Sequence, residues 1–385
     1  MKNKLLSVLI PTKDRYRTLI PVLTGLINDF KDANIEFIVQ DNTLDNNEIV
    51  KYLSLLNSNK IKYFHTSNSL SQSENCNYSV KNSNGQYLIL IGDDDYVMPS
   101  IIEAIIWMEN NSVECLNYNI ASYLWNDISF KYKTSISKGG TLLLNKPLMK
   151  TFTLLDPKIE LNKVIESGGT DYADLPRLYH GIVKRVVLDR VYKKCKTYFP
   201  GLSPDMASST AIAIFAKVFY KYNFPLSISG KSSFSAAGKG VNHTHVGNLD
   251  KMDFLDKSLL KKWNIKIPYF WSGDTIYAQS IHHALNICGG VESKINYNRL
   301  YAHLLVFERK SILTKMNPIT NTIKNNYTNL FIILFWYFIF FKNRLLNYLF
   351  RKIYPNKFYS IHNGIDQITR CVKIIENKKI KFYNV

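Results

Sequence analysis

Short apolar runs alternate with helical patterns over the first 110 residues. The apolar run at residues 5–10 stops at Pro11, and apolar residues at helical spacing follow over 19–30. Residues 35–39 alternate between apolar and polar, and residues 61–64 are a further short strand candidate. This order of strands and helices predicts a mainly parallel sheet that is covered by helices on both faces.

The same alternation continues to residue 110. Ser71 followed by Glu74 indicates a capping box, which predicts a helix that runs to about Lys81. Residues 88–91 are all aliphatic, as expected of a strand that is buried on both faces. Pro99 then opens another apolar helix.

Polar clusters follow three of these strands. Asp93, Asp94 and Asp95 come directly after residues 88–91, and residues 12–15 and 41–42 follow the first two strands. Ligands bind at the carboxyl ends of parallel strands, so we expect the three clusters to form one site. Neighbouring carboxylates repel one another unless a cation lies among them. Because no GxGxxG or P-loop motif occurs here, a metal ion would have to hold any phosphate.

The composition is that of a globular chain in a reducing compartment. The chain has 385 residues, of which 46% are hydrophobic, enough for two domains. Its 5 cysteines are odd in number and show no CxxC pairing, which argues against a disulfide framework and a zinc ribbon. Charged residues at 13–15 interrupt the first apolar run, so no signal peptide is predicted.

The net charge of +19 lies mainly in the C-terminal part of the chain. Residues 309–365 contain nine basic residues and no acidic one, and they enclose the apolar run LFIILFWYFIFF at 330–341. Twelve residues fall short of the roughly 20 that a spanning helix needs, so a helix in the lipid interface, or one partly inserted, fits better. Contiguous aromatic residues are poorly spaced for stacking on bases, which disfavours nucleic acid. The basic flanks at 342–344 and 351–352 favour an anionic membrane surface, while a core helix or an oligomer contact stays open.

Three ordered segments carry a family resemblance. LSVLIPTKDR, IEFIVQDN and LSQSENCNYSVKNSNGQYLILIGDDDYVMP resemble the nucleotide-sugar-binding half of a family 2 glycosyltransferase of the GT-A fold, over about residues 4–110. The resemblance implies a nucleotide pocket at the first strand end, a base or ribose contact from the second, and an asparagine on the helix before the acidic strand. The residues concerned are Pro11, Thr12, Asp14, Arg15, Asp41 and Asn75.

The acidic cluster resembles the DxD-type motif of that family. The resemblance implies that Asp93 and Asp95 bind Mg²⁺ or Mn²⁺ and that Asp93 and Asp94 contact the nucleotide. Gly92 stands where the motif often begins with an acid, so the contacts of each aspartate remain open. The alternative is an acidic turn that only stabilises the start of a helix.

The second half of the chain offers a candidate general base. In FPGLSPDMASSTAIAIF, Ser203 can cap a helix, Pro204 suits its first position, and Asp205 lies in its first turn. The resemblance implies that Asp205 deprotonates the acceptor hydroxyl, whereas a capping carboxylate is the structural alternative. Asp171 and Asp174 are further candidates for the base.

A loop rich in glycine and serine covers residues 230–247. Its composition suits a segment that folds over bound donor, and His243 or His245 could complete the metal shell or contact phosphate. An alternating His-x-His is also common in solvated loops. Lys231 and Lys239 either steer the diphosphate or are solvated.

These expectations combine into an enzyme of three parts. Residues 1–112 form the nucleotide-sugar-binding half of a GT-A domain, 113–248 its acceptor-side half, and 249–385 a mostly helical, basic, membrane-associating region in which His282 and His283 lie on a packed helix. The resemblance implies an inverting hexosyl- or N-acetylhexosaminyltransferase on the cytoplasmic face of the plasma membrane. Its donor would be a nucleotide sugar linked to UDP, and its acceptor a lipid-linked molecule or a polysaccharide, as in O-antigen or capsule assembly. A nucleotidyltransferase and a non-catalytic scaffold are the alternatives.

Overall fold

The computed structural model describes residues 4–130, 134, 136–235, 238, 246–289 and 294–378. The first part of the chain alternates strand and helix, as predicted, and its four strands pair in parallel in the order β4-β1-β2-β3. These strands are β1 (Lys4–Thr12), β2 (Ile35–Asp41), β3 (Ile61–His65) and β4 (Gly85–Leu90). The helices are α1 (Tyr16–Asp29), α2 (Asn47–Leu56), α3 (Gln72–Lys81) and α4 (Ile101–Asn110).

The structure confirms one local prediction, the capping box of α3, and corrects another, the end of β1. The capping box of α3 is present, with reciprocal bonds between Ser71 and Glu74. Strand β1 does not stop at Pro11 but continues to Thr12. The carbonyl of Leu9 accepts a hydrogen bond from β4's side of the sheet. Because backbone groups two residues apart in a strand face the same side, the nitrogen of Pro11 also faces β4, but the pairing with β4 ends at Leu9. A proline at this position therefore costs the sheet no hydrogen bond.

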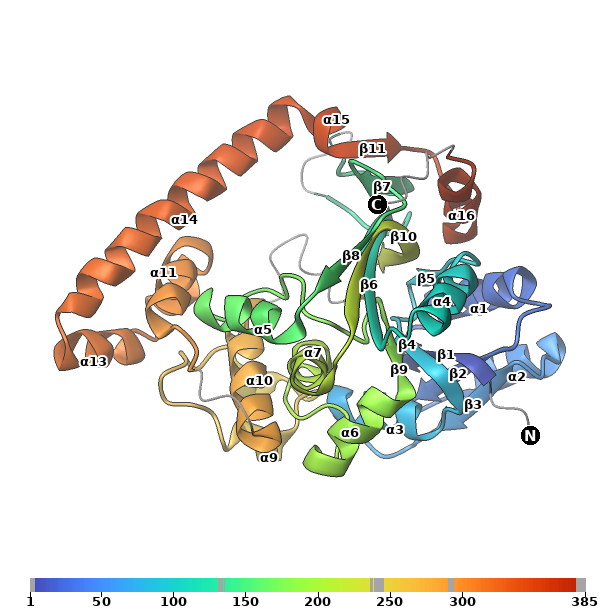
Figure 1. The fold of residues 1–385 in the computed structure, drawn as a ribbon, viewed down its shortest axis with the longest axis horizontal. Helices are drawn as coiled ribbons and strands as arrows, with labels where there is room; N and C mark the ends of the chain where they lie inside the picture. Colours follow the sequence, from blue (N-terminus) through green and yellow to red (C-terminus); the bar gives the residue numbers. More distant parts are fainter. Residues whose placement is uncertain are drawn as a thin grey trace.

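The sheet grows beyond β4 by mostly antiparallel pairing, so the whole sheet is mixed (Figure 1). Strand β9 lies antiparallel between β4 and β6, while β6 and β10 are parallel to each other. The added strands are β5 (Tyr96–Val97), β6 (Cys115–Leu124), β7 (Thr141–Asn145), β8 (Phe152–Leu155), β9 (Gly181–Lys184) and β10 (Phe219–Lys231). The helices of this part are α5 (Pro157–Glu166), α6 (Arg185–Cys195) and α7 (Pro204–Phe215).

Helices cover both faces of the parallel strands, which confirms the predicted layers. Ile89 of β4 packs in a core with α1 and α4, whereas Leu88 packs in a second core with α3, α6 and α7. Burial on both faces explains the unbroken aliphatic run in β4. The carboxyl ends of these strands are therefore held rigidly from both sides.

The C-terminal region is mostly helical, as expected, and its helices share a core with α5 and α7. His282 is half-buried and His283 is buried, both on α10, which confirms that they lie on a packed helix. After α14 the chain returns to the first sheet, where β11 pairs with β7 and α16 packs on the core (Figure 1). The elements are η1 (Leu249–Lys251), α9 (Lys257–Leu260), α10 (Gly273–Cys288), α11 (Tyr297–Phe307), α12 (Arg309–Ile312), α13 (Asn317–Asn325), α14 (Thr328–Ile353), α15 (Pro355–Phe358), β11 (Tyr359–His362) and α16 (Ile368–Glu376).

Helix α14 is longer than the apolar run at 330–341 suggested. It has 26 residues, and its segment Thr328–Phe350 is long and apolar enough to cross a membrane, with 6% of the most apolar window buried. The count of contiguous apolar residues underestimated this length because the polar residues at 328–329 and 342–344 interrupt the run without ending the helix.

Candidate active site

The polar clusters at the ends of β1 and β4 meet, as predicted. The hydroxyl of Thr12 donates to Asp93 Oδ2 at 2.6 Å, and Arg15 Nε lies 3.0 Å from the same oxygen. Burial lowers the pKa of Arg15, but Asp93 and Asp94 outweigh it and raise this pKa overall. A fixed cation thus stands beside the first aspartate of the turn.

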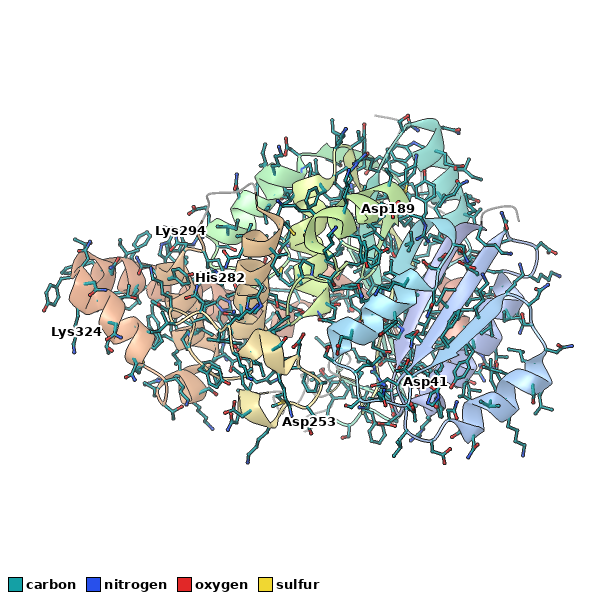
Figure 2. All side chains as sticks on the ribbon, turned by 90° about the horizontal axis from the view of Figure 1, so that it is seen from below. Asp41, Asp189, Asp253, His282, Lys294 and Lys324 are labelled. Atoms are coloured by element: carbon teal, nitrogen blue, oxygen red, sulfur yellow. The ribbon has the colours of Figure 1, made fainter. Side chains whose placement is uncertain are left out.

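Asp41 lies at the end of β2, on the same edge of the sheet (Figure 2). Its Oδ2 accepts hydrogen bonds from Tyr16 at 2.6 Å and Tyr63 at 2.9 Å, and its Oδ1 accepts one from the amide of Thr43 at 2.8 Å. Both oxygens therefore already have protein donors. A nucleotide that approached this end of β2 would meet the two phenol rings before the carboxylate.

Asn75 on α3 ties the ends of two strands together. Its side-chain amide donates to the carbonyl of Thr12 at 3.2 Å and to that of Gln40 at 3.3 Å, while its Oδ1 is buried without a partner. Pro11 is half-buried beside it, whereas the side chain of Asp14 is exposed. Asn75 is thus a positioning residue with one oxygen still available.

The three adjacent aspartates do not point the same way. Asp93 Oδ1 is buried and has no partner, and burial, only partly offset by Arg15, raises the pKa of Asp93 to about 7. Asp94 Oδ2 accepts hydrogen bonds from the amide and hydroxyl of Ser232 at 3.0 and 2.7 Å. Burial and the neighbouring Asp95 raise the pKa of Asp94 as well. Both carboxylates keep one oxygen to which no described residue donates.

Asp95 instead accepts hydrogen bonds on both of its carboxylate oxygens. Its Oδ2 accepts from the amide of Gly92 at 2.7 Å and from Tyr179 at 2.8 Å, and Nε2 of His180 lies 3.0 Å away. Its Oδ1 accepts from the amide of Gly230 at 2.7 Å. Burial raises the pKa of Asp95, but His180 and these donors outweigh it and lower this pKa overall. The contacts favour Asp93 and Asp94 over Asp95 as metal ligands.

Two glycines make room for this arrangement. A Cβ at Gly92 would lie 3.0 Å from Asp95 Oδ2 and 3.2 Å from Asp94 Oδ1, so an acidic side chain there would crowd the turn. A Cβ at Gly230 would lie 1.7 Å from the carbonyl oxygen of Asp94, which no side chain can do. The missing acid at position 92 is therefore compatible with an intact turn.

The free oxygens of Asp93 and Asp94 fit a divalent cation, which would relieve the repulsion between them. Within the described part of the chain, no group of three His, Cys, Asp or Glu side chains is close enough to hold an ion. Lys239, His243 and His245 lie outside the described residues. Other ligands would have to come from the substrate, from water or from that loop.

Asp205 lies in the first turn of α7, as predicted, although Ser203 makes no capping hydrogen bond with its side chain. Burial raises the pKa of Asp205 to about 6, with Tyr172, His180 and Arg177 acting in the opposite direction. Asp205 also interacts electrostatically with Asp95, so it belongs to the same site as the aspartate turn. A carboxylate with this pKa can accept a proton near neutral pH.

The two alternative bases lie elsewhere. Asp171 is exposed and accepts a hydrogen bond from the amide of Ala173 at 2.8 Å. Asp174 forms an ion pair with Lys221 at 2.6 Å. Neither carboxylate interacts with Asp205 or with the turn in any contact of the described residues, which favours Asp205 as the base.

Four residues of the segment that leads into β9 were missed by the sequence reasoning. Tyr179 and His180 hold Asp95, while Tyr172 and Arg177 lie beside Asp205. The Nε of Arg177 is buried without a partner, and its guanidinium lies 6.0 Å from the ring of Tyr172. No spacing rule marks such residues, because their place depends on how the segment folds back on α7.

Lys231, at the end of β10, is half-buried rather than solvated. Burial lowers its pKa, and no acidic side chain of the described ranges forms an ion pair with it. It follows Gly230, whose amide donates to Asp95, so the backbone of Lys231 lies next to that turn.

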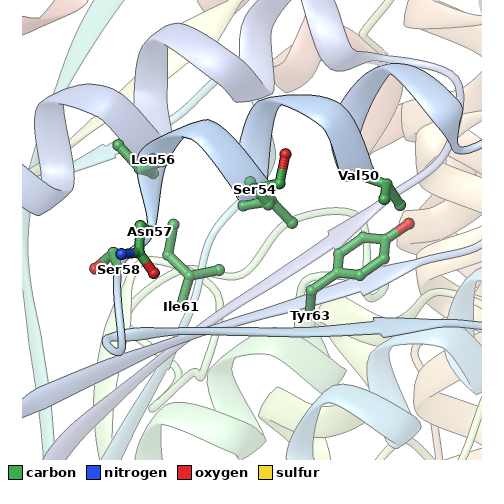
Figure 3. Close-up of a pocket in the computed structure, with 8 residues that line it drawn as sticks. Val50, Ser54, Leu56, Asn57, Ser58, Ile61 and Tyr63 are labelled. Carbon is green, nitrogen blue, oxygen red and sulfur yellow. The ribbon is translucent and has the colours of Figure 1, made fainter.

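A hollow of about 360 Å³ lies between α2 and β3 (Figure 3). Val50, Ser54, Ile61 and Tyr63 are among its lining residues, and none of the predicted site residues lines it. Tyr63 alone connects it to the site, through its hydrogen bond with Asp41. We therefore place the candidate site at the aspartate turn and not in this hollow.

The chain is similar to known structures and matches a family model. Three solved structures from S. aureus are similar at 16% identity and a TM-score of 0.42: TarS, TarS 1–349 in complex with UDP, and TarS 1–349 in complex with UDP-GlcNAc. The matches cover 60%, 60% and 64% of this chain and 37%, 61% and 63% of theirs, so the chain spans less than two thirds of each. No relative with a curated description matches. Residues 7–168 match the family model of glycosyl transferase family 2, which confirms the resemblance over this part of the chain.

Proposed function

We propose that the chain transfers a sugar from a nucleoside-diphosphate sugar, with UDP as the nucleotide, to a hydroxyl group of an acceptor. The observation that carries this proposal is the position of Asp205. A carboxylate whose pKa is raised to about 6 stands across from an aspartate turn that has two free carboxylate oxygens. One side of the site suits a proton acceptor and the other suits a metal-bound diphosphate.

The reaction needs one base and one stabilised leaving group. A carboxylate oxygen of Asp205 takes the proton of the acceptor hydroxyl as that oxygen forms its bond to the anomeric carbon. The bond from this carbon to the diphosphate breaks, its electron pair leaves with the diphosphate, and the configuration inverts. Mg²⁺ or Mn²⁺, held by Asp93 and Asp94, would supply positive charge to the departing diphosphate.

Two cationic side chains lie at this site, and a third residue, Lys231, adjoins it through the backbone. Arg15 contacts Asp93, Arg177 lies beside Asp205, and Lys231 follows the glycine that contacts Asp95. Arg177 and Lys231 have no acidic partner among the described side chains, so both are available to an anionic substrate. We assign Lys231 to the donor diphosphate and Arg177 to the region between donor and acceptor.

The acceptor is proposed to be lipid-linked or a polysaccharide, with the enzyme on the cytoplasmic face of the membrane. Helix α14 supports this assignment, because Phe331, Phe335 and Phe338 on it are 72%, 60% and 64% exposed. Replacing all three by serine should abolish co-flotation with anionic lipid vesicles. If the variant floats as the unchanged protein does, α14 is not the membrane contact.

The test of the donor site is titration calorimetry with UDP, in the presence and absence of Mn²⁺. We expect metal-dependent binding in the unchanged protein and its loss in Asp94→Asn, because the asparagine oxygen can still accept from Ser232 while its amide replaces the free oxygen. Asp32→Asn, an exposed aspartate in the loop between α1 and β2, is the matched control. If neither UDP, GDP nor dTDP binds with Mn²⁺, the chain is not a transferase of this kind.

A further inference from the structure

A second hollow lies where the chain returns from α14 to the sheet. Its volume is about 480 Å³, and it is formed by the end of β7, the segment from α15 to β11 and the end of α16. Figure 1 shows α15 and β11 directly beyond the end of α14 and beside β7. The lining residues are Lys146, Pro147, Leu148, Lys357, Ser360 and Lys378.

Three of these residues are lysines whose charge is not balanced. Lys378 Nζ donates to Ser360 Oγ at 2.7 Å, and Lys146 Nζ donates to the carbonyl of Asn356 at 3.0 Å. Over the described ranges, no acidic side chain forms an ion pair with any of the three. Burial and the charge of Lys146 lower the pKa of Lys378, which shows that the ammonium groups repel one another. A hollow of this kind attracts an anion.

The chemistry of the lining favours phosphate over a singly charged carboxylate. A phosphate group presents up to two negative charges and several acceptor oxygens, enough for three ammonium groups and a serine hydroxyl at once. Lysine binds phosphate as a compact point charge and needs no planar partner. We propose that this pocket binds a phosphate group, and that its source is the headgroup of an anionic lipid.

We choose a lipid headgroup as the source of the phosphate because the pocket lies next to the end of α14. The last turns of α14 and the residues after it expose large apolar side chains at Leu349, Phe350, Ile353, Tyr354 and Phe358. A helix that lies in the membrane interface places its apolar side chains at the boundary with the acyl chains and its lysines among the lipid phosphates. The residues beside this pocket have the same arrangement. The choice of a lipid source rests on the proposed membrane attachment, whereas phosphate binding itself does not.

The experiment compares the full chain with two triple variants. One carries Lys146→Gln, Lys357→Gln and Lys378→Gln, and the control carries Lys51→Gln, Lys158→Gln and Lys257→Gln, three exposed lysines on other elements. Both variants lose the same net charge. Each protein is floated with vesicles of phosphatidylcholine with and without phosphatidic acid, and its Tm is measured with inorganic phosphate against chloride at equal ionic strength.

We expect the pocket variant to bind phosphatidic acid vesicles about 100-fold more weakly, which is about 3 kcal/mol for three lysines near the surface. The control should change by about twofold or less. Inorganic phosphate at ten times its Kd should raise the Tm of the unchanged protein and of the control by about 2 °C, and not that of the pocket variant. UDP binding with Mn²⁺ should be the same in all three proteins.

The other outcomes separate the parts of the proposal. If phosphate stabilises only the proteins with an intact pocket but vesicle binding is unchanged, the ligand is a soluble phosphate and the lipid assignment is overturned. If phosphate stabilises none of them and both variants bind vesicles equally, the pocket is not a phosphate site. Failure of UDP binding with an intact phosphate effect would overturn the proposed function and leave the pocket standing.

Discussion

Replacing Asp205 by asparagine should stabilise the protein while it removes activity. The asparagine side chain has the shape of a protonated aspartate and carries no charge, so it avoids the cost of holding a carboxylate in a buried place. Activity should fall by about 10²- to 10⁴-fold, because the acceptor hydroxyl loses its general base. A residue that served only to support the fold would show the opposite pattern, with lower stability.

The expected gain in the free energy of unfolding follows from the shift in the pKa of Asp205. Burial raises the pKa of Asp205 from its ordinary value of 3.8 to about 6. Between these two values the folded state binds more protons than the unfolded state, so stability falls as the pH rises through this window. Above pH 7 the charged carboxylate costs about 3 kcal/mol, at about 1.4 kcal/mol for each pKa unit. For a chain of 385 residues this corresponds to about 4 °C in Tm.

The assay is thermal unfolding of both proteins at pH 8 and pH 5, followed by circular dichroism. The stabilisation of the variant should be about half as large at pH 5 as at pH 8, because the aspartate in the folded state is mostly protonated at pH 5. Asp32→Asn is the control, and its exposed side chain should change stability by less than about 0.5 kcal/mol at either pH. A gain that does not depend on pH, or a loss at pH 8, would refute the reasoning.

The remaining predictions concern the turn and its neighbours. Asp95→Asn should lower the free energy of unfolding by about 2–4 kcal/mol, because the NH₂ group of the asparagine would face a backbone N–H in either orientation. Urea unfolding measures this loss. Gly230→Ala should destabilise by about 3 kcal/mol or more in the same assay, because a Cβ there would lie 1.7 Å from the carbonyl oxygen of Asp94. Arg177→Gln should move the acid limb of kcat/KM to higher pH, because Arg177 lowers the pKa of Asp205. Lys231→Gln should raise the KM for the donor with little change in Tm, and an unchanged KM would exclude a diphosphate contact.

The sequence predicted the parts that local rules encode. The alternating strands and helices, the capping box at Ser71 and the meeting of Thr12 with Asp93 all follow from periodicity and from the geometry of parallel sheets. The contacts of Asp95 could not be predicted, because they come from Gly230 and from the segment at 177–180, far away along the chain. The length of α14 was underestimated because a count of contiguous apolar residues misses a helix that continues through a short polar stretch, here residues 342–344.

The contacts of Asp95 explain how a turn of three aspartates can serve a substrate that is itself negatively charged. Three carboxylates without partners beside a diphosphate would repel it, but the amides of Gly92 and Gly230 donate to Asp95 and His180 lies 3.0 Å from it, so the protein itself stabilises this carboxylate. Asp95 is thereby held by the protein, although its charge still raises the pKa of Asp94. Among the described residues, none donates to one oxygen of Asp93 and one of Asp94, and under the proposed function one divalent cation would neutralise both oxygens. Under the proposed function the turn would work as one anchor and two ligands, and the two roles should separate on substitution, with stability lost at Asp95 and metal-dependent nucleotide binding lost at Asp94.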